Sequence, residues 1–447
     1  MNKTYVSTRN HQDQINFYQA IVQGIGDDGG LLVPNFDFQK LDLNKLVQLN
    51  YVDLATEVIS TFVPEDGKEL IHQACLNAYG KGLFPEIVVP VKKAGDVYVA
   101  ELFHGQTAAF KDMALSLLPH LMTLSLKQLK EDREVMILAA TSGDTGKAAL
   151  EGFKDVEGTC IKVFYPLDGV SAIQQQQMVS QEGKNVKVVG IHGNFDDAQS
   201  AVKVAFGDKM LKEVSDQHHV FLSSANSINV GRLIPQIVYY FHSYFELVRN
   251  KEIEMGDQVN FCVPSGNFGN ITAGLFGKKM GLPVKRFIAA NNRNDIFYQY
   301  LQTGKYNPRP SIATIANAMD VGDPSNFARV LDLYSGSHAD ISAEISGTTY
   351  TDEQIRETVK ETWKEHHYLL DPHGACGYRA LVEGLKEGET GVFLETAHPA
   401  KFKDTVENII GEAIQIPEKL QAFMRGEKKS LPMSKDFADF KRYLMNI

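Results

Sequence analysis

The sequence has few cysteines and no paired cysteine motif. Its 447 residues contain four, at Cys75, Cys160, Cys262 and Cys376, all widely separated. The absence of a Cys-x-x-Cys pair excludes a zinc ribbon and argues against a disulfide framework. We therefore expect free, buried thiols in a cytoplasmic protein.

The chain also lacks a long apolar run and an excess of positive charge. No run reaches membrane-spanning length, and the first ten residues lack the apolar core of a secretory signal. The formal net charge of −10 argues against nucleic acid or anionic membranes as partners, because both are negatively charged. An anionic small substrate is compatible with this charge only if its pocket is locally positive.

From residue 134 onward, short apolar runs alternate with helical stretches. Six of these runs predict buried strands, at residues 135–140, 160–165, 186–191, 220–222, 258–263 and 284–290. Helices are expected to begin near Thr145, Ser171 and Asp196, and again at Gly269. This alternation indicates parallel sheets with right-handed crossover helices.

The pattern divides the chain into three regions. Residues 1–95 are expected to be mostly helical, with little strand signal, and the G-x-G-x-x-G at residues 24–29 is interpreted as a turn because no helix follows it. Residues 126–229 form a small α/β domain, whereas residues 96–125 and 230–447 form a larger one. The run of glutamines at residues 174–177 is too short to count as low complexity.

A lysine in an apolar setting marks the first candidate site. Lys111 follows a short predicted strand and a loop of small residues, and it begins a stretch with helical apolar spacing. The helix dipole and the flanking Phe110 and Met113 both disfavour an ammonium, so the pKa of Lys111 should fall toward a nucleophilic amine. Taken alone, the pattern also fits a surface lysine.

Two glycine-containing loops each follow a predicted strand and precede a predicted helix. In P-S-G-N-F-G-N, residues 264–270, the glycines would let the backbone approach a phosphate, which free N–H groups and the helix dipole would bind. T-S-G-D-T-G-K, residues 141–147, is not a P-loop, because Thr141 replaces the first glycine and Ala148 replaces the magnesium-binding hydroxyl residue.

A third segment, N-S-I-N-V-G-R at residues 226–232, combines an amide, a hydroxyl and a guanidinium. This set suits a phosphate dianion, since Arg232 can contact two oxygens while Asn226 and Ser227 donate to the third. A helix cap followed by a surface arginine is the alternative.

Together these segments resemble the threonine synthases. F-H-G-Q-T-A-A-F-K-D around Lys111 and the three segments above occur in the family's order, and Y-V-S-T-R-N, D-P-H-G-A and T-A-H-P-A-K-F extend the likeness over nearly the whole chain. Gly374 and Asn10 depart from the D-P-H-T and S-T-R-G of many members. The resemblance implies the α/β fold of tryptophan synthase β, fold type II of the pyridoxal-phosphate enzymes: two parallel-sheet α/β domains, a helical N-terminal region, and pyridoxal 5'-phosphate between the domains.

The resemblance also implies roles for individual residues. Lys111 would bind the cofactor aldehyde and act as the base, and Thr396 would meet the pyridine nitrogen and leave the ring neutral. The cofactor is expected to contact Phe110, Lys111, Asp144, Gly266, Asn267, Phe268, Gly269, Asn270 and Thr396. The substrate is expected to contact Ser142, Gly143, Asp144, Thr145, Asn226, Ser227 and Arg232. The protonation state of Asp144 is left open.

The implied reaction converts O-phospho-L-homoserine and water into L-threonine and phosphate. Two alternatives stay open: a phospholyase of the same fold that releases a keto acid and ammonia, and a catalytically silent paralogue that binds a phosphorylated amino acid. No metal is expected, because His366, His367 and His373 lack the spacing of a zinc-binding helix. A monomer is expected by similarity.

Overall fold

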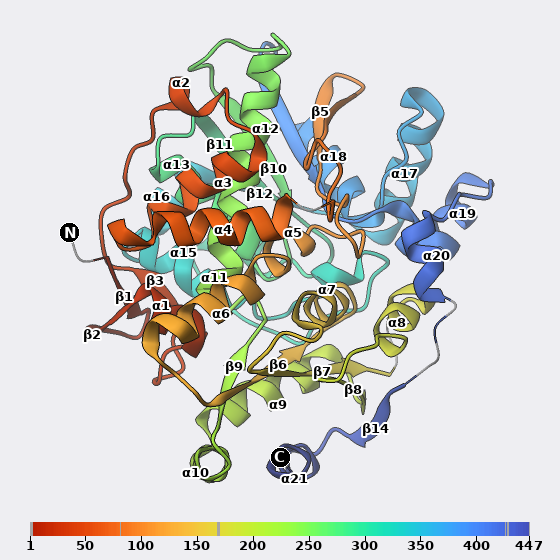
Figure 1. Cartoon of the computed structure of the whole chain (residues 1–447). Helices are drawn as coiled ribbons and strands as arrows, with labels where there is room; N and C mark the ends of the chain where they lie inside the picture. Colours follow the sequence, from red (N-terminus) through yellow and green to blue (C-terminus); the bar gives the residue numbers. More distant parts are fainter. Residues whose placement is uncertain (1–2, 81, 168–169, 425, 427–428, 447) are drawn as a thin grey trace.

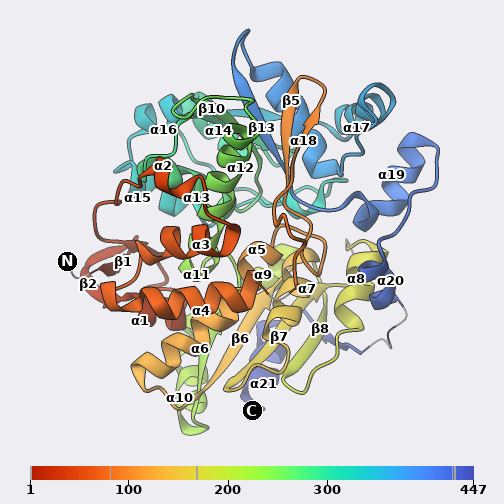
Figure 2. The ribbon, with the colours of Figure 1, turned by 45° about the horizontal axis from the view of Figure 1, so that its top comes forward.

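The computed structural model describes residues 3–80, 82–167, 170–424, 426 and 429–446. One fully parallel and one mostly parallel β-sheet lie one above the other, with α5 (Asp112–Leu115) and α7 (Asp144–Phe153) between them (Figures 1 and 2). The strands expected from the sequence all form, within two residues of their expected ends.

The smaller sheet has five parallel strands in the order β14-β8-β7-β6-β9. Its strands are β6 (Glu134–Ala140), β7 (Thr159–Pro166), β8 (Val186–His192), β9 (Val220–Ser224) and β14 (Leu431–Ser434). Two helices, α7 and α8 (Ala172–Val179), pack on one face. The other face is covered by α9 (Phe195–Gly207), α10 (Lys209–Gln217) and α21 (Phe437–Met445).

The larger sheet has six strands in the order β12-β11-β10-β13-β5-β4, of which only β4 is antiparallel. The strands are β4 (Val91–Ala94), β5 (Val97–Glu101), β10 (Val259–Pro264), β11 (Val284–Asn291), β12 (Ile345–Thr349) and β13 (Thr390–Glu395). Its helices are α12 (Ile237–Arg249), α13 (Gly269–Lys279), α14 (Ile296–Thr303), α15 (Phe327–Leu333), α16 (His338–Glu344), α17 (Asp352–His366) and α18 (Pro372–Gly384).

Side chains of the larger sheet alternate between two cores, as a strand period of two residues requires. Phe261 and Phe287 face α12 and α13 in the main core, whereas Cys262 and Ile288 face α17 and α18 in a second core. Both faces of the sheet are therefore buried, which explains the nearly continuous apolar runs in its central strands.

The N-terminal region differs from the expectation of little strand. Three short antiparallel strands, β1 (Thr4–Ser7), β2 (Asn10–Asn16) and β3 (Leu32–Pro34), form a sheet in the order β2-β1-β3. The helices of this region are α1 (Phe17–Gln23), α2 (Leu43–Leu46), α3 (Tyr51–Ser60) and α4 (Lys68–Tyr79). The strand prediction failed here because β2 is mostly exposed and polar, so it carries no apolar alternation.

The end of the chain also differs from the expected division into domains. After α19 (Lys403–Ile410) and α20 (Glu418–Met424), β14 hydrogen-bonds in parallel to β8, and α21 buries Phe440 and Leu444 in the core of the smaller sheet. Residues 431–445 therefore pack on the smaller sheet, although the sequence suggested that they belong to the larger unit.

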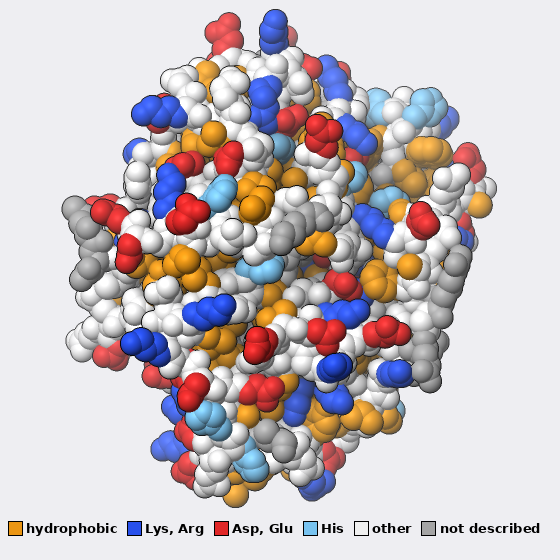
Figure 3. Space-filling model, in the orientation of Figure 1, with side chains coloured by type: hydrophobic (Ala, Val, Ile, Leu, Met, Phe, Trp, Pro, Cys, Tyr) orange, Lys and Arg blue, Asp and Glu red, His pale blue; other side chains and the backbone are white. Residues whose placement is uncertain are grey.

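Acidic and basic side chains are interspersed over the face drawn in Figure 3. Within the described ranges, no helix is both long enough and apolar enough to cross a membrane.

Candidate active site

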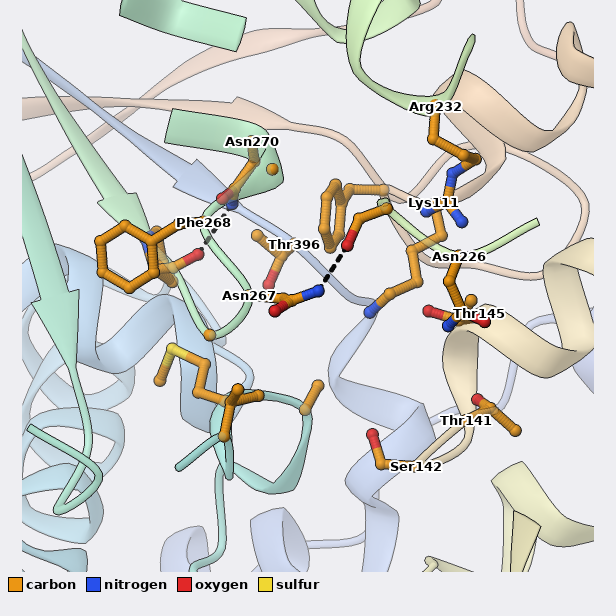
Figure 4. A pocket seen from close by; sticks show the side chains of 18 of the residues that line it. Lys111, Thr141, Ser142, Thr145, Asn226, Arg232, Asn267, Phe268, Asn270 and Thr396 are labelled. Atoms are coloured by element: carbon orange, nitrogen blue, oxygen red, sulfur yellow. Dashed lines mark hydrogen bonds between the residues drawn. The ribbon is translucent and has the colours of Figure 1, made fainter. Parts of the chain in front are cut away.

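A cavity lies where the carboxyl ends of strands from both sheets meet, and most of the expected site residues line it. Those in its wall are Phe110, Lys111, Ser142, Thr145, Asn226, Ser227, Arg232, Gly266, Asn267, Phe268, Gly269, Asn270 and Thr396. Two expected residues, Gly143 and Asp144, are not part of this wall. Figure 4 shows the Lys111 side chain reaching into the cavity, with Asn267 and Thr396 on one side and Asn226 and Thr145 on the other.

The loop before Lys111 is fixed by hydrogen bonds at both ends. The Asp112 carboxylate accepts from the backbone N–H of Thr107 at 2.8 Å and from its hydroxyl at 2.6 Å. The Phe110 N–H donates to the Thr396 carbonyl at 2.7 Å, which ties the loop to the end of β13. Lys111 is the N-cap residue of α5, so the chain presents its amine from a rigid loop at the start of a helix.

The pKa of Lys111 is lowered to about 8. Burial is the largest cause; Arg232 and Lys401 lower the pKa further by charge repulsion, and Asp144 opposes them. Most copies of this side chain are therefore still protonated at neutral pH, but the free amine is far more abundant than in an ordinary lysine. Because the surrounding protein desolvates Lys111 and its side chain lines the cavity, the alternative of a surface lysine is wrong.

The loop at residues 264–270 joins β10 to α13 and opens toward the cavity. Phe268 is the N-cap residue of α13, has a left-handed backbone (φ 63°) and makes no side-chain cap hydrogen bond. Asn270 fixes the turn by accepting from the Ser265 hydroxyl at 2.6 Å and donating to the Pro264 carbonyl at 2.9 Å. The positive end of an 11-residue helix therefore faces the cavity, an arrangement that suits a phosphate group.

The loop at residues 141–147 is shaped by one hydroxyl. Thr141 Oγ1 accepts from the N–H groups of Gly143 at 2.9 Å and Gly146 at 2.8 Å. Gly143 has a φ of 139°, which a residue with a side chain rarely adopts. This conformation leaves Ser142 and Thr145 in the cavity wall at the N-terminus of α7, a suitable place for a carboxylate.

Asp144 is buried beside two residues that the sequence analysis did not assign to the site. Its Oδ1 atom lies 2.8 Å from Lys401 Nζ and accepts from Gln174 Nε2 at 2.9 Å. Burial raises the pKa of Asp144, but the charges of Lys401 and Lys111 and these hydrogen bonds outweigh burial, so the pKa is lowered. Asp144 is therefore ionised.

Lys401 and Gln174 each had a usable signal in the sequence. Lys401 belongs to the T-A-H-P-A-K-F segment, and its Nζ also donates to the Thr107 carbonyl at 2.8 Å, which connects Asp144 to the lysine loop. Gln174 lies in the run of glutamines at residues 174–177, and its side chain is buried beside Asp144. The run is too short to be a low-complexity tract, but it places buried polar side chains on α8.

Arg232 is almost fully buried, with 2% of its surface exposed. Its Nη1 donates to the Ala225 carbonyl at 2.5 Å, and its Nε has no hydrogen-bond partner among the described residues. Burial lowers the pKa of Arg232 to about 10, so the guanidinium remains charged at neutral pH. The alternative of a surface arginine is wrong, since this cation lines the same cavity as Lys111.

Asn226 and Ser227 occupy different environments. The Asn226 amide donates to the Ala140 carbonyl at 2.7 Å and accepts from its N–H at 3.0 Å, so it holds the end of β6. Ser227 Oγ accepts from Asn267 Nδ2 at 2.6 Å and from Asn326 Nδ2 at 3.2 Å, which leaves its own hydrogen available for a ligand. Of the two, Ser227 is the better candidate for an anion contact.

Arg329, a residue to which the sequence analysis gave no role, supports this segment. Its fully buried guanidinium donates to the carbonyls of Ser227 at 2.9 Å, Ile228 at 2.7 Å and Leu32 at 3.0 Å. It thereby joins the segment at residues 226–232 to β3 of the N-terminal sheet. No local sequence pattern distinguishes such an arginine from a surface one.

The residues in the cavity fit pyridoxal 5'-phosphate. Lys111 supplies an amine of lowered pKa for an aldehyde, and the uncapped N-terminus of α13 supplies a site for a phosphate. At Gly266 a Cβ atom would lie 2.8 Å from Met319 Cα, so only glycine allows the backbone to pass so closely here. Among the residues with described positions, no group of three or more His, Cys, Asp or Glu could hold a metal ion.

Family models agree with this geometry. Residues 89–396 match the model described as pyridoxal-phosphate dependent enzyme. Residues 4–79 match the threonine synthase N terminus, and residues 374–444 match the threonine synthase C-terminal region.

Individual proteins agree as well. The chain is 38% identical over 435 residues to threonine synthase of Haemophilus influenzae, with 97% of both chains covered. The crystal structure of threonine synthase from Escherichia coli superimposes with a TM-score of 0.89 at 37% identity and 99% coverage of both chains. A pyridoxal-phosphate-bound threonine synthase from Brucella melitensis gives a TM-score of 0.87 at 33% identity, again covering 99% of both chains. The expected fold and the lysine loop are present, and the matches cover nearly the whole chain. The chain therefore belongs to the threonine synthase family of pyridoxal-phosphate-dependent enzymes.

Proposed function

We propose that the chain converts O-phospho-L-homoserine and water into L-threonine and phosphate. The observation that carries the proposal is a buried guanidinium, Arg232, in the wall of the cavity that contains the Lys111 amine. The amine that would bind the cofactor aldehyde and a cation that could bind a substrate phosphate therefore line the same cavity.

Each region of the site has one task in this proposal. The N-terminus of α13 and the loop at residues 266–270 would hold the cofactor phosphate, and the Thr396 hydroxyl would meet the pyridine nitrogen. Ser142, Thr145 and the N-terminus of α7 would bind the substrate carboxylate. Arg232 and Ser227 would bind the substrate phosphate.

Pyridoxal phosphate, when bound, supplies an electron sink that makes the protons of the substrate carbon chain acidic. Lys111 would take the proton from Cα and return protons along the chain, for which an amine with a pKa of about 8 is well suited. The ionised Asp144 stabilises the ammonium form of Lys111, which must exist after each proton is taken. Arg232 would stabilise the charge that gathers on the departing phosphate and retain that phosphate while water adds at Cβ.

Product identification tests the proposal and separates the two alternatives. Purified enzyme supplied with O-phospho-L-homoserine should release threonine and phosphate in equal amounts. Release of phosphate with a keto acid and ammonia would instead identify a phospholyase. Substrate binding without turnover, in an enzyme that shows the absorbance of its bound cofactor, would identify a silent paralogue.

We also propose that the enzyme is a cytoplasmic monomer. The monomer follows from the resemblance to the threonine synthases. The four free cysteines, three of them buried, fit a reducing compartment. Sedimentation of the purified protein tests the assembly state.

A further inference from the structure

Glu395 is a completely buried acid directly before Thr396. It ends β13, whose side chains alternate, so that Glu395 faces α18 and Thr396 faces the cavity. Its Oε1 accepts the backbone N–H of Asp371 at 2.7 Å, whereas its Oε2 has no hydrogen-bond partner in the described part of the chain. An ionised carboxylate with a single donor would be costly in this position.

Gly374 makes room for this side chain. A Cβ atom at residue 374 would lie 1.6 Å from Glu395 Oε2 and 2.4 Å from its carboxyl carbon. Any side chain at residue 374 therefore excludes the observed position of Glu395. The steric exclusion accounts for the glycine in D-P-H-G-A, which the sequence analysis noted as a departure from the family pattern.

The nearest strand places a second buried acid beside Glu395. Glu101 of β5 is its cross-strand partner. Glu101 is compensated by Lys92 at 3.0 Å, His104 at 2.8 Å and the Tyr368 hydroxyl at 2.9 Å. These contacts outweigh burial and lower the pKa of Glu101, so its carboxylate is ionised.

The third acid of the group, Asp371, is also compensated. It caps α18 by accepting from the N–H groups of His373 at 2.8 Å and Gly374 at 3.3 Å, and it pairs with His373 Nδ1. Among the residues with described positions, Glu395 has neither a cation nor a second donor. Burial and repulsion from Asp371 and Glu101 raise the pKa of Glu395, so it is the acid that holds a proton.

His373 connects these acids to the cavity. Its Nε2 accepts the Ala318 N–H at 3.1 Å, which requires the imidazole proton on Nδ1, where it is donated to Asp371. Ala318 and Met319 line the cavity and press against Gly266 of the α13 loop. A chain of contacts thus runs from Glu395 through Asp371 and His373 to the wall of the cavity.

We propose that Glu395 is a positioning residue that works as a neutral carboxylic acid, fixing the Asp371–His373 pair that holds the Ala318 segment against the α13 loop. Ionisation of Glu395 would add a third negative charge beside Glu101 and Asp371 and would disrupt this pair. The contacts around Glu395 do not depend on which reaction the enzyme catalyses, so only the kinetic test rests on the proposed function.

The first test compares the stability of the holoenzyme and its Glu395→Gln variant across pH. Above the ordinary glutamate pKa of 4.5, native Glu395 keeps a proton that the unfolded chain releases, so stability from this group falls as pH rises. The unfolding equilibrium constant of the parent, relative to that of the variant, should rise by up to about tenfold per pH unit. If the stabilities of parent and variant change in parallel with pH, Glu395 is not a neutral acid, since Glu101, Asp371 and His373 are present in both proteins.

The second test uses the steric exclusion. Gly374→Ala should lower the melting temperature of the holoenzyme. In an enzyme that already carries Glu395→Ala, adding Gly374→Ala should cause no further decrease. Glu395→Ala alone is the matched control. A loss from Gly374→Ala that is equally large in both backgrounds would overturn the relation between the two residues.

The third test is kinetic. Glu395→Leu and His373→Phe should each raise KM for O-phospho-L-homoserine, and the double variant should be no worse than the more impaired single variant, because both act on Ala318. If the KM increases of the two single variants multiply in the double variant, the two residues do not act through one chain of contacts, and the proposal is wrong. A parent without turnover would refute the proposed function instead, and the first two tests would still decide the role of Glu395.

Discussion

Replacing Arg232 by leucine should separate substrate recognition from the cofactor chemistry. The change removes a buried cation and the donor to the Ala225 carbonyl, while the apolar part of the side chain is retained. An unsatisfied buried carbonyl costs about 1–3 kcal/mol in the free energy of unfolding. Loss of a charge-assisted contact to the substrate phosphate costs about 1.5–3 kcal/mol, which corresponds to about ten- to a hundredfold in kcat/KM.

Part of this loss should appear in kcat, because negative charge gathers on the phosphate as it departs. The assay measures kcat/KM for O-phospho-L-homoserine, which should fall, and product inhibition by phosphate, which should weaken. Arg232→Lys is the matched control: it keeps the charge but not the paired N–H groups, so its loss should be smaller. The absorbance of the bound cofactor should not change in either variant. A leucine variant with parental kcat/KM and parental phosphate inhibition would refute the assignment.

Three further predictions concern other buried groups. Lys111→Ala should abolish turnover, and borohydride reduction of the parent followed by peptide mapping should label Lys111 and no other lysine. Lys401→Met removes the nearest cation from Asp144 and should raise its pKa, so the acid limb of kcat/KM should move to higher pH; an unmoved limb would argue against a catalytic need for ionised Asp144. Burial lowers the pKa of His242 to about 4 from 6.5, so the unfolded chain alone takes up this proton as pH falls through that window. The contribution of His242 to the free energy of unfolding should therefore drop by about 3 kcal/mol between pH 7 and 4, and in denaturant titrations the stability of a His242→Phe variant should fall by that much less than the parent's over this range.

The central strands could be predicted because burial on both faces gives them continuous apolar runs. In β6 and β10 the runs end within a residue of the observed strands. β2 could not be predicted in this way, since its residues are mostly exposed and polar. The short β14 could not be assigned to its sheet, because pairing with β8, more than 200 residues earlier, leaves no local pattern.

The candidate site was predictable where function is carried by a loop with a recognisable motif. Lys111 and the loop at residues 266–270 are of this kind. Arg329 is different, because it acts through contacts with distant parts of the chain. A buried arginine has the same letter as an exposed one, so only the packed structure distinguishes them.

The return of the chain to β8 has a consequence for how the protein is made. Until residues 431–434 have been synthesised, the edge of β8 has no strand beside it, and the face later covered by α21 stays open to water. Exposed strand edges and apolar faces invite pairing with other chains. During translation the smaller sheet is therefore complete only after residues 431–445 have been made. A chain that stopped before them would contain all the catalytic loops, but an edge of its sheet would be open to aggregation.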